Sequence, residues 1–149
     1  MEEYYKIVAE MIGAQLRAYN TDLTRMLKSV TASVFLNQLL YWSSRTGDVG
    51  GWIYKTSEDF EAEIGLTRHQ QLSAQSLLEE LGIITVVLKP VDNGRPSQVR
   101  HYRVELKTLY EMCGKWRESR SQMLKNQQLT AGGGENNSSV SIPPDSKVL

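Results

Sequence analysis

The chain has 149 residues, of which 40% are hydrophobic, and its 17 lysines and arginines balance 17 aspartates and glutamates. A chain of this length can bury a core without help from a metal or a disulfide. Its single cysteine, Cys113, excludes a disulfide within the chain, and no Cys/His cluster has the spacing of a metal site. The balanced net charge argues neither for nor against a nucleic-acid partner, and no cofactor is expected.

The beginning of the chain, MEEYYKIVAEM, has no basic region followed by a long apolar run and therefore does not predict a signal peptide. No apolar stretch approaches the roughly 20 residues that are needed to cross a bilayer. We therefore expect a soluble, cytoplasmic protein without a membrane partner.

The first expected helix covers residues 2–19. Apolar side chains recur along it at three- and four-residue spacing and form one stripe. This stripe either packs on the domain core or forms the seam of a homodimer. Residues 1–28 then comprise this helix and a connection, and the candidate dimerisation residues are Tyr5, Val8, Ile12 and Leu16.

Residues 31–44 form the next expected helix, which is apolar on most sides and is therefore expected at the centre of its domain. A loop over residues 46–51 and a short strand over residues 51–55 follow it. Another helix is expected over residues 57–64, with Thr56 as its N-cap. The first turn of this helix is acidic, and we expect its acidic side chains to face away from DNA: Glu58, Asp59 and Glu61.

A second short helix follows after a tight turn, over residues 68–81. Thr67 can accept from the backbone N–H of Gln70, whose side chain can reach back, and this reciprocal pair is a capping box. Gly82 suits the left-handed conformation that ends a helix, and residues 83–88 are β-branched or aliphatic and predict a strand. Two short helices with a tight turn, followed by strands, indicate a helix-turn-helix with a wing, whose second helix enters the major groove of DNA.

The wing is expected between the strand over residues 83–88 and a strand over residues 99–106. The Asn-Gly pair at positions 93 and 94 is a strong hairpin-turn signal, because both residue types tolerate positive φ. Hydrophobic side chains alternate along the second strand, as expected for a half-buried strand. The residues expected on its buried face are Tyr102, Val104 and Leu106.

A basic, amphipathic helix is expected over residues 107–128, with Tyr110 among the residues that face the body. Residues 129–149 are rich in Gly, Asn, Ser and Pro and are expected to form a disordered polar tail. The expected fold class is therefore mainly α with a small β-hairpin. It is a winged helix-turn-helix domain over residues 29–110 with extra N- and C-terminal helices.

The first turn and a half of the second short helix would reach base edges. Arg68 can bind guanine, and Gln71 or Gln75 can bind adenine, because these side chains match the hydrogen-bonding edges of those bases. Leu72 has two explanations, contact with a thymine methyl or packing against the wing or a partner subunit. His69 is expected at a phosphate or in solvent, because no second titratable partner lies nearby in the sequence. The candidate residues of this helix are Thr67, Arg68, His69, Gln71, Leu72 and Gln75.

Basic residues concentrate in the second half of the chain. Residues 1–80 hold seven basic and eleven acidic side chains, whereas residues 81–128 hold nine and four. A localised basic region is the usual electrostatic footprint of a DNA-binding protein, although surface cations are often only solvated. Arg95, at the expected wing tip, can enter a minor groove, and the other cations can contact phosphates without reading sequence. The candidate cations are Lys55, Lys89, Arg95, Arg100 and Arg103.

Four runs occur in order within about residues 30–110: LYWSSR, GWIYKTSEDFEAEIGLTRHQQ, LEELGII and GRPSQVRHYRV. Together they resemble the winged-helix domain of phage and prophage replication proteins, which are replication initiators or replisome organisers, often with a DnaD-like layout. The shared features are a Tyr-Trp pair, a Trp-x-Tyr-Lys strand, a Thr-Arg-x-x-Gln helix start, and a Gly-x-Pro wing before a Tyr-bearing strand. Here they correspond to Tyr41, Trp42, residues 52–55, Thr67, Arg68, Gln71, Gly94, Pro96 and Tyr102.

The resemblance implies binding to double-stranded DNA at a replication origin or an operator. It also implies recruitment of a helicase loader or another replisome protein through a C-terminal extension. Larger members of the family carry a further helical domain after the winged helix, whereas this chain has one basic helix and a polar tail. A small transcriptional repressor of a phage or mobile element therefore stays an alternative to replication initiation.

An enzyme is not expected. The sequence has no Gly-rich phosphate loop, and neither histidine has a nearby Ser, Cys or carboxylate in a recognisable arrangement. A protein-interaction scaffold is a more serious alternative, because winged helices also self-associate without DNA and the balanced charge is compatible with that role. Under this alternative, the apolar stripe of the first helix controls self-association.

Overall fold

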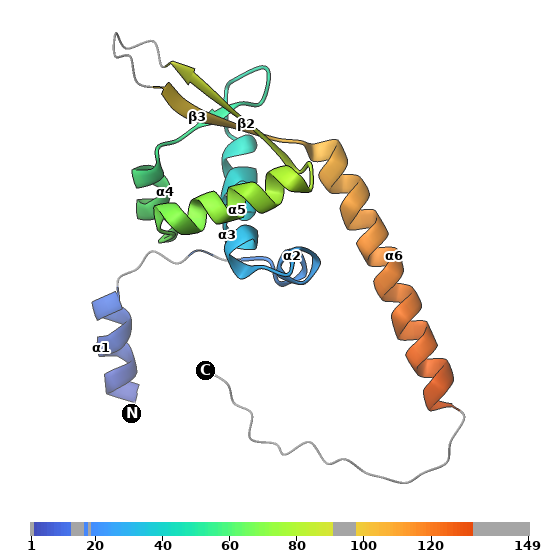
Figure 1. The fold of residues 1–149 in the computed structure, drawn as a ribbon. Helices are drawn as coiled ribbons and strands as arrows, with labels where there is room; N and C mark the ends of the chain where they lie inside the picture. Colours follow the sequence, from blue (N-terminus) through green and yellow to red (C-terminus); the bar gives the residue numbers. More distant parts are fainter. Residues whose placement is uncertain (1, 13–16, 18, 91–97, 133–149) are drawn as a thin grey trace. The chain divides into compact units, whose positions relative to one another are not determined.

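The computed structural model describes residues 2–12, 17, 19–90 and 98–132, without the side chains of residues 2, 5 and 9. Within these residues, contacts divide the chain into two units, Met1–Met112 and Cys113–Leu149. Helices α2 to α5 and a small sheet belong to the first unit (Figure 1). The elements in chain order are α1 (Glu2–Ile12), α2 (Thr21–Leu27), α3 (Val30–Ser43), β1 (Ile53–Tyr54), α4 (Ser57–Ile64), α5 (Arg68–Glu80), β2 (Ile84–Pro90), β3 (Gln98–Val104) and α6 (Leu106–Ala131).

The N-terminal region differs from the expected single helix over residues 2–19. Helix α1 ends at Ile12, and neither Arg17 nor Tyr19 is helical. The side chain of Asn20 accepts from the backbone nitrogens of Asp22 and Leu23, so Asn20 is the N-cap of the unpredicted helix α2. Because an N-cap residue has extended backbone angles, here φ −89° and ψ 117°, no helix can run through this position.

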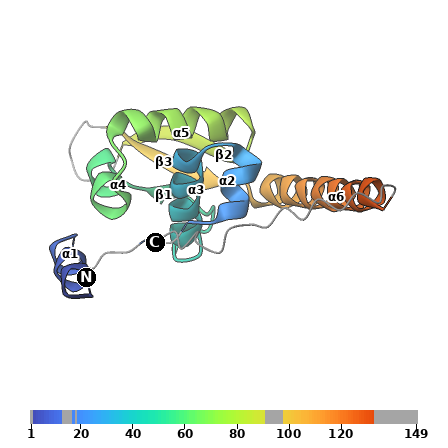
Figure 2. The ribbon, with the colours of Figure 1, turned by 90° about the horizontal axis from the view of Figure 1, so that it is seen from below.

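Helix α3 occupies the centre of the first unit, as its apolar sequence predicts. Phe35, Leu36 and Leu39 have no exposed surface. The ring of Phe35 lies 4.9 Å from the ring of Phe60 in α4 and 5.7 Å from that of Tyr102 in β3. Such tilted and edge-to-face aromatic pairs add to the stability gained by burying the rings. They join α3, α4 and β3, while α2 and α5 also pack on α3 (Figure 2).

The three strands form an antiparallel sheet in the order β1-β3-β2. Ile53 pairs with Tyr102, and Ile84 pairs with Val104, and all four side chains are buried on one face. Gly82, at φ +72°, ends α5 in the left-handed conformation and leads into β2, as predicted. Leu106 was expected on the buried face of a longer strand, but it begins α6 and is 60% exposed.

Helix α6 extends beyond its expected limits of residues 107 and 128. It reaches Ala131, so residues 129–131 are helical, and the part of the expected tail after residue 132 lies outside the described residues. Leu109 is buried, but its neighbour Tyr110 is 80% exposed, contrary to the expectation that Tyr110 faces the body. Neighbouring residues of a helix point about 100° apart, so one of the pair can face the core while the other faces solvent.

The topology confirms the predicted fold class. Three helices, α3, α4 and α5, pack with a three-stranded antiparallel sheet, and α4 and α5 form a helix-turn-helix. The wing tip, residues 91–97, lies outside the described residues together with its Asn-Gly turn. No helix in the described ranges is long and apolar enough to span a membrane.

Candidate nucleic-acid interface

Two capping boxes define the helix-turn-helix. In α5, the hydroxyl of Thr67 accepts from the backbone nitrogen of Gln70 at 3.3 Å, and the side chain of Gln70 accepts from the backbone nitrogen of Thr67 at 2.9 Å. Thr56 and Asp59 form the same reciprocal pair at the start of α4. Both helices therefore begin where the sequence predicts. Thr67 is exposed, but its hydroxyl is already used by the cap.

Helix α5 turns one side toward the core and the other toward solvent. Gln71, Ala74 and Leu78 are buried. The exposed side chains of His69 and Ser73 are four residues apart and therefore lie on one side of the helix. Ser73 was not among the candidate contacts, although the helical period alone places it beside His69. The exposed stripe continues through Ser76 to Glu80.

The structure contradicts the assignment of Gln71 as an adenine contact. Gln71 is only 4% exposed. Its side-chain nitrogen donates to the backbone carbonyl oxygens of Ser57 and Leu66, at 2.9 Å each. Both protons of the amide are thereby used, and the side chain connects α5 to the start of α4 and to the turn between them.

The other two uncharged candidates of α5 are half-buried. Gln75 donates to the carboxylate of Glu79 at 3.3 Å, which is a weak surface contact that a base could replace. Leu72 is also half-buried, and this position is compatible with either of its two explanations, a thymine contact or packing.

Two predicted arginines meet in one surface depression of about 350 Å³. Arg68 comes from the first turn of α5, and Arg100 comes from β3, where it pairs with Leu88 on the helix-facing side of the sheet. Neither arginine forms an ion pair with another described residue. Glu58 lines the same depression, although the acidic residues of α4 were expected to face away from DNA.

Lys55 also lines this depression, but its charge is already neutralised. Its ammonium group forms an ion pair with Glu63 and lies 3.6 Å from the centre of the Trp42 ring. Glu63 accepts further hydrogen bonds from the side chains of Gln38 at 2.8 Å and Trp42 at 2.9 Å. Burial disfavours the charged carboxyl, but these hydrogen bonds outweigh it and hold the pKa of Glu63 below its ordinary value. Lys55 is therefore held by partners within the fold, and the expected extra phosphate contact would have to compete with Glu63.

Lys89 and Arg103 lie on the outer face of the sheet, opposite to Arg100. Side chains alternate between faces along a strand, so Arg100 and Arg103 point to different sides. The charged groups of Lys89 and Arg103 lie 4.5 and 4.7 Å from the centre of the Trp52 ring, and Arg103 also pairs with Glu105 at 2.9 Å. The cations that were expected around one wing are thus divided between the two faces of the sheet. Arg95 lies outside the described residues.

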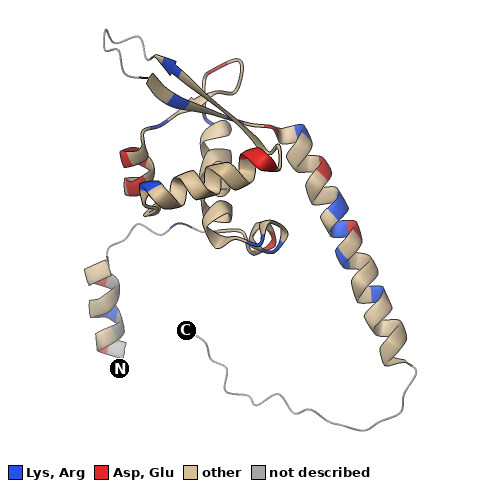
Figure 3. Ribbon diagram, viewed as in Figure 1, with Lys and Arg blue, Asp and Glu red and all other residues tan. Residues whose placement is uncertain are grey.

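Charge is unevenly distributed over the helix-turn-helix. Arg68 and His69 are at the N-terminal end of α5, whereas Glu79 and Glu80 are at its C-terminal end, and α4 is acidic (Figure 3). His69 lines a second depression together with Ser29 and Thr31 at the start of α3. The basic end of α5 therefore lies between two depressions.

The candidate dimerisation stripe of α1 is only partly described. Val8 is 50% exposed and Ile12 is 79% exposed, so neither side chain is buried in a core. The side chain of Tyr5 and all of Leu16 lie outside the described residues. Elsewhere in the described chain, no three side chains from His, Cys, Asp and Glu are grouped so that they could hold a metal ion.

Comparison with protein-family models and with curated proteins finds no match to this sequence. Among solved structures, the chain is similar to a "Possible transcriptional regulator from Methanosarcina mazei Go1", with a TM-score of 0.48 and 17% sequence identity. The similarity covers 76% of this chain and 87% of the other. A TM-score and a sequence identity this low describe only a general structural similarity and do not indicate a function.

Proposed function

We propose that this protein binds double-stranded DNA sequence-specifically, with the first turns of α5 in the major groove and the sheet beside the sugar-phosphate backbone. The observation that carries this proposal is the convergence of Arg68 and Arg100 on one depression, where neither has an ion-pair partner among the described residues. One arginine comes from the start of a helix and the other from a strand. Two guanidinium groups that line one depression can bind a phosphate or another planar or anionic group.

In this proposal the two arginines have different roles. Arg68 projects from the exposed start of α5 and reads a guanine edge through two parallel hydrogen bonds. Arg100 is half-buried on the sheet and contacts a phosphate, which positions the protein without reading sequence. His69, Ser73 and Gln75 would lie along the groove, and Lys89 and Arg95 would add wing contacts.

The test is fluorescence anisotropy of labelled duplexes, selected from a random pool, at two salt concentrations. Arg68→Ala should lose about 1–3 kcal/mol of discrimination between the selected and unselected duplexes. Arg100→Ala should weaken binding to every duplex similarly and reduce the salt slope by about 1. Arg25→Ala, which removes an exposed cation of α2, is the control and should bind like the wild type. If both Arg68→Ala and Arg100→Ala bound DNA with wild-type affinity, this mode of binding would be ruled out.

The biological role that we propose is initiation of replication of a phage or mobile element, in which a helicase loader or another replisome protein is the further partner. Support comes from the ordered motifs between residues 40 and 104 that resemble phage replication proteins. A repressor would use the same DNA-binding surface. The roles are separated by whether the selected site lies in a replication origin or over a promoter.

A second candidate function, a scaffold that self-associates through α1, is supported by one observation. Tyr4, Val8, Met11 and Ile12 are all at least half exposed on this short helix. If the arginine variants bind DNA like the wild type while Val8→Asp lowers the molecular mass in solution, the scaffold function replaces DNA binding as the proposal.

A further inference from the structure

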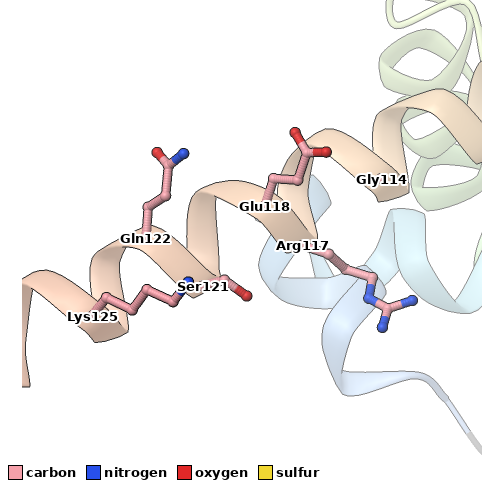
Figure 4. A pocket seen from close by; sticks show the side chains of 6 residues that line it. All are labelled: Gly114, Arg117, Glu118, Ser121, Gln122 and Lys125. Atoms are coloured by element: carbon pink, nitrogen blue, oxygen red, sulfur yellow. The ribbon is translucent and has the colours of Figure 1, made fainter.

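Helix α6 has an apolar side and a polar side. After Leu109, the single buried residue of this fully described helix, apolar side chains recur on one side at Met112, Trp116 and Met123. The opposite side is polar, and Figure 4 shows its side chains along a shallow groove. The residues that line this groove are Gly114, Arg117, Glu118, Ser121, Gln122 and Lys125.

The apolar side of α6 is open to solvent over the second half of the helix. Met123, on this side, is 63% exposed. Helices in water gain most of their stability from packing of an apolar face, and Gly114 in the helix interior further lowers intrinsic stability by about 1 kcal/mol. The helix therefore needs a partner surface for its apolar side.

The spacing of the apolar residues indicates what kind of partner fits. Leu109, Trp116 and Met123 recur at every seventh position, and Met112 lies three residues after Leu109. A seven-residue repeat keeps side chains in register with a second helix that has the same repeat. We propose that α6 pairs in antiparallel direction with α6 of a second copy of this chain, through a seam made by Met112, Trp116, Ser119 and Met123.

Side-chain size favours the antiparallel direction. In that direction Trp116 packs against Ser119 of the second copy, and Met112 packs against Met123 of the second copy. A large residue then fills the space beside a small one in each half of the seam. In a parallel pair, the two Trp116 rings would meet each other and the two Ser119 side chains would leave a void.

Charge favours the same direction. In a parallel pair, Lys115 of one copy would lie beside Arg120 of the other, at the edge of the seam. The two positive charges would repel each other. In the antiparallel pair, Lys115 lies beside Gln122 and Arg120 lies beside Cys113. Glu118 cannot neutralise either cation across the seam, because it lies two residues after Trp116, about 200° around the helix from that side chain.

Sedimentation equilibrium of the full chain without DNA tests self-association. The mass should rise with concentration from 16.9 kDa toward twice this value. Trp116→Glu should weaken association by about tenfold or more, because tryptophan is enriched among the residues that contribute most to an interface. Ser121→Glu, on the polar side of the same helix, is the matched control and should associate like the wild type. A monomer at every concentration would overturn the proposal.

Cysteine cross-linking tests the direction and does not depend on the glutamate variant folding. In a Cys113→Ser background, Met112→Cys and Met123→Cys are made separately. Oxidation of a mixture of the two should give a disulfide-linked dimer, and oxidation of each alone should give little. Efficient cross-linking of Met112→Cys alone would show a parallel pair and overturn the proposal. Because no DNA is present, this result is independent of the proposed DNA binding.

Discussion

The side-chain nitrogen of Gln71 in α5 lies 2.9 Å from the backbone carbonyl oxygen of Ser57 in the first turn of α4. The same nitrogen donates to the carbonyl oxygen of Leu66 in the turn between the helices. One buried amide thus connects both helices of the helix-turn-helix and the turn that joins them. The direction in which Arg68 leaves the surface depends on this connection, because Arg68 is less than one helical turn before Gln71.

Replacing Gln71 by Ala should lower the free energy of unfolding by about 1–3 kcal/mol, because the two carbonyl groups lose their shared partner in a buried place. Urea denaturation measures this loss. Gln75→Ala is the matched control on the same helix and should change stability by about 0.5 kcal/mol at most, since its contact with Glu79 is at the surface. Equal effects of the two substitutions would contradict the structural role of Gln71.

Glu63→Gln should lower the free energy of unfolding by about 1–3 kcal/mol at neutral pH, because it removes the charged acceptor of Lys55, Trp42 and Gln38. The pKa of Glu63 is lowered in the folded state. Its contribution is therefore complete above the ordinary carboxyl pKa of 4.5 and is lost as the pH falls through the lowered value.

Denaturation of both proteins between about pH 7 and about pH 3 measures this pH dependence. The difference between wild type and Glu63→Gln should shrink on the acidic side of the range. Glu61→Gln removes an exposed carboxylate from the same helix and should stay within about 0.5 kcal/mol of the wild type. A difference that grows in acid would show that the hydrogen bonds do not favour the charged carboxyl.

Glu58→Gln should strengthen binding to any duplex by about two- to fivefold at low salt, since exposed charge interactions contribute up to about 1 kcal/mol. The reason is that Glu58 lines the same depression as Arg68 and Arg100 and would repel a phosphate there. The gain should fade as salt is added. Glu111→Gln, on α6, is the control, and an equal gain in both variants would point to net charge alone.

Gly114→Ala should raise the helical content of the chain and stabilise α6 by about 1 kcal/mol, because alanine restricts the unfolded chain more than glycine does. A Cβ atom at this position would meet no atom within 4 Å, so no steric cost opposes the gain. Far-UV circular dichroism during thermal unfolding measures the effect. Since Gly114 lies on the polar side of α6, self-association should not be weakened.

Local hydrogen-bonding and backbone signals were sufficient to place the helix-turn-helix. Thr56 and Thr67 mark the starts of α4 and α5 because a hydroxyl three residues before a free backbone N–H caps a helix wherever it occurs. Gly82 marks the end of α5 because glycine has little strain at positive φ. The apolar pattern of α3 likewise predicted a central helix, since burial on all sides requires apolar residues on all sides.

The same local rules failed where a second element decided the environment. Asn20 could have shown the cap of α2, but the apolar stripe before it extended the expected helix to residue 19. Gln71 is polar and three residues from Arg68, so the sequence suited a base contact, yet the carbonyl groups of Ser57 and Leu66 bind it inside the fold. Lys55 likewise forms an ion pair with Glu63 and lies over the ring of Trp42.

The amino-acid sequence by itself determined where α4 and α5 begin and where α5 ends, because caps and glycines act over a few residues. The folded chain was needed to distinguish the arginines that share a surface from those that do not. Arg68 and Arg100 line one depression, whereas Arg103 is on the other face of the sheet and is paired with Glu105. The reason is that strand register and helix packing, which are set by long-range contacts, decide which side chains meet and which of them keep a free charge.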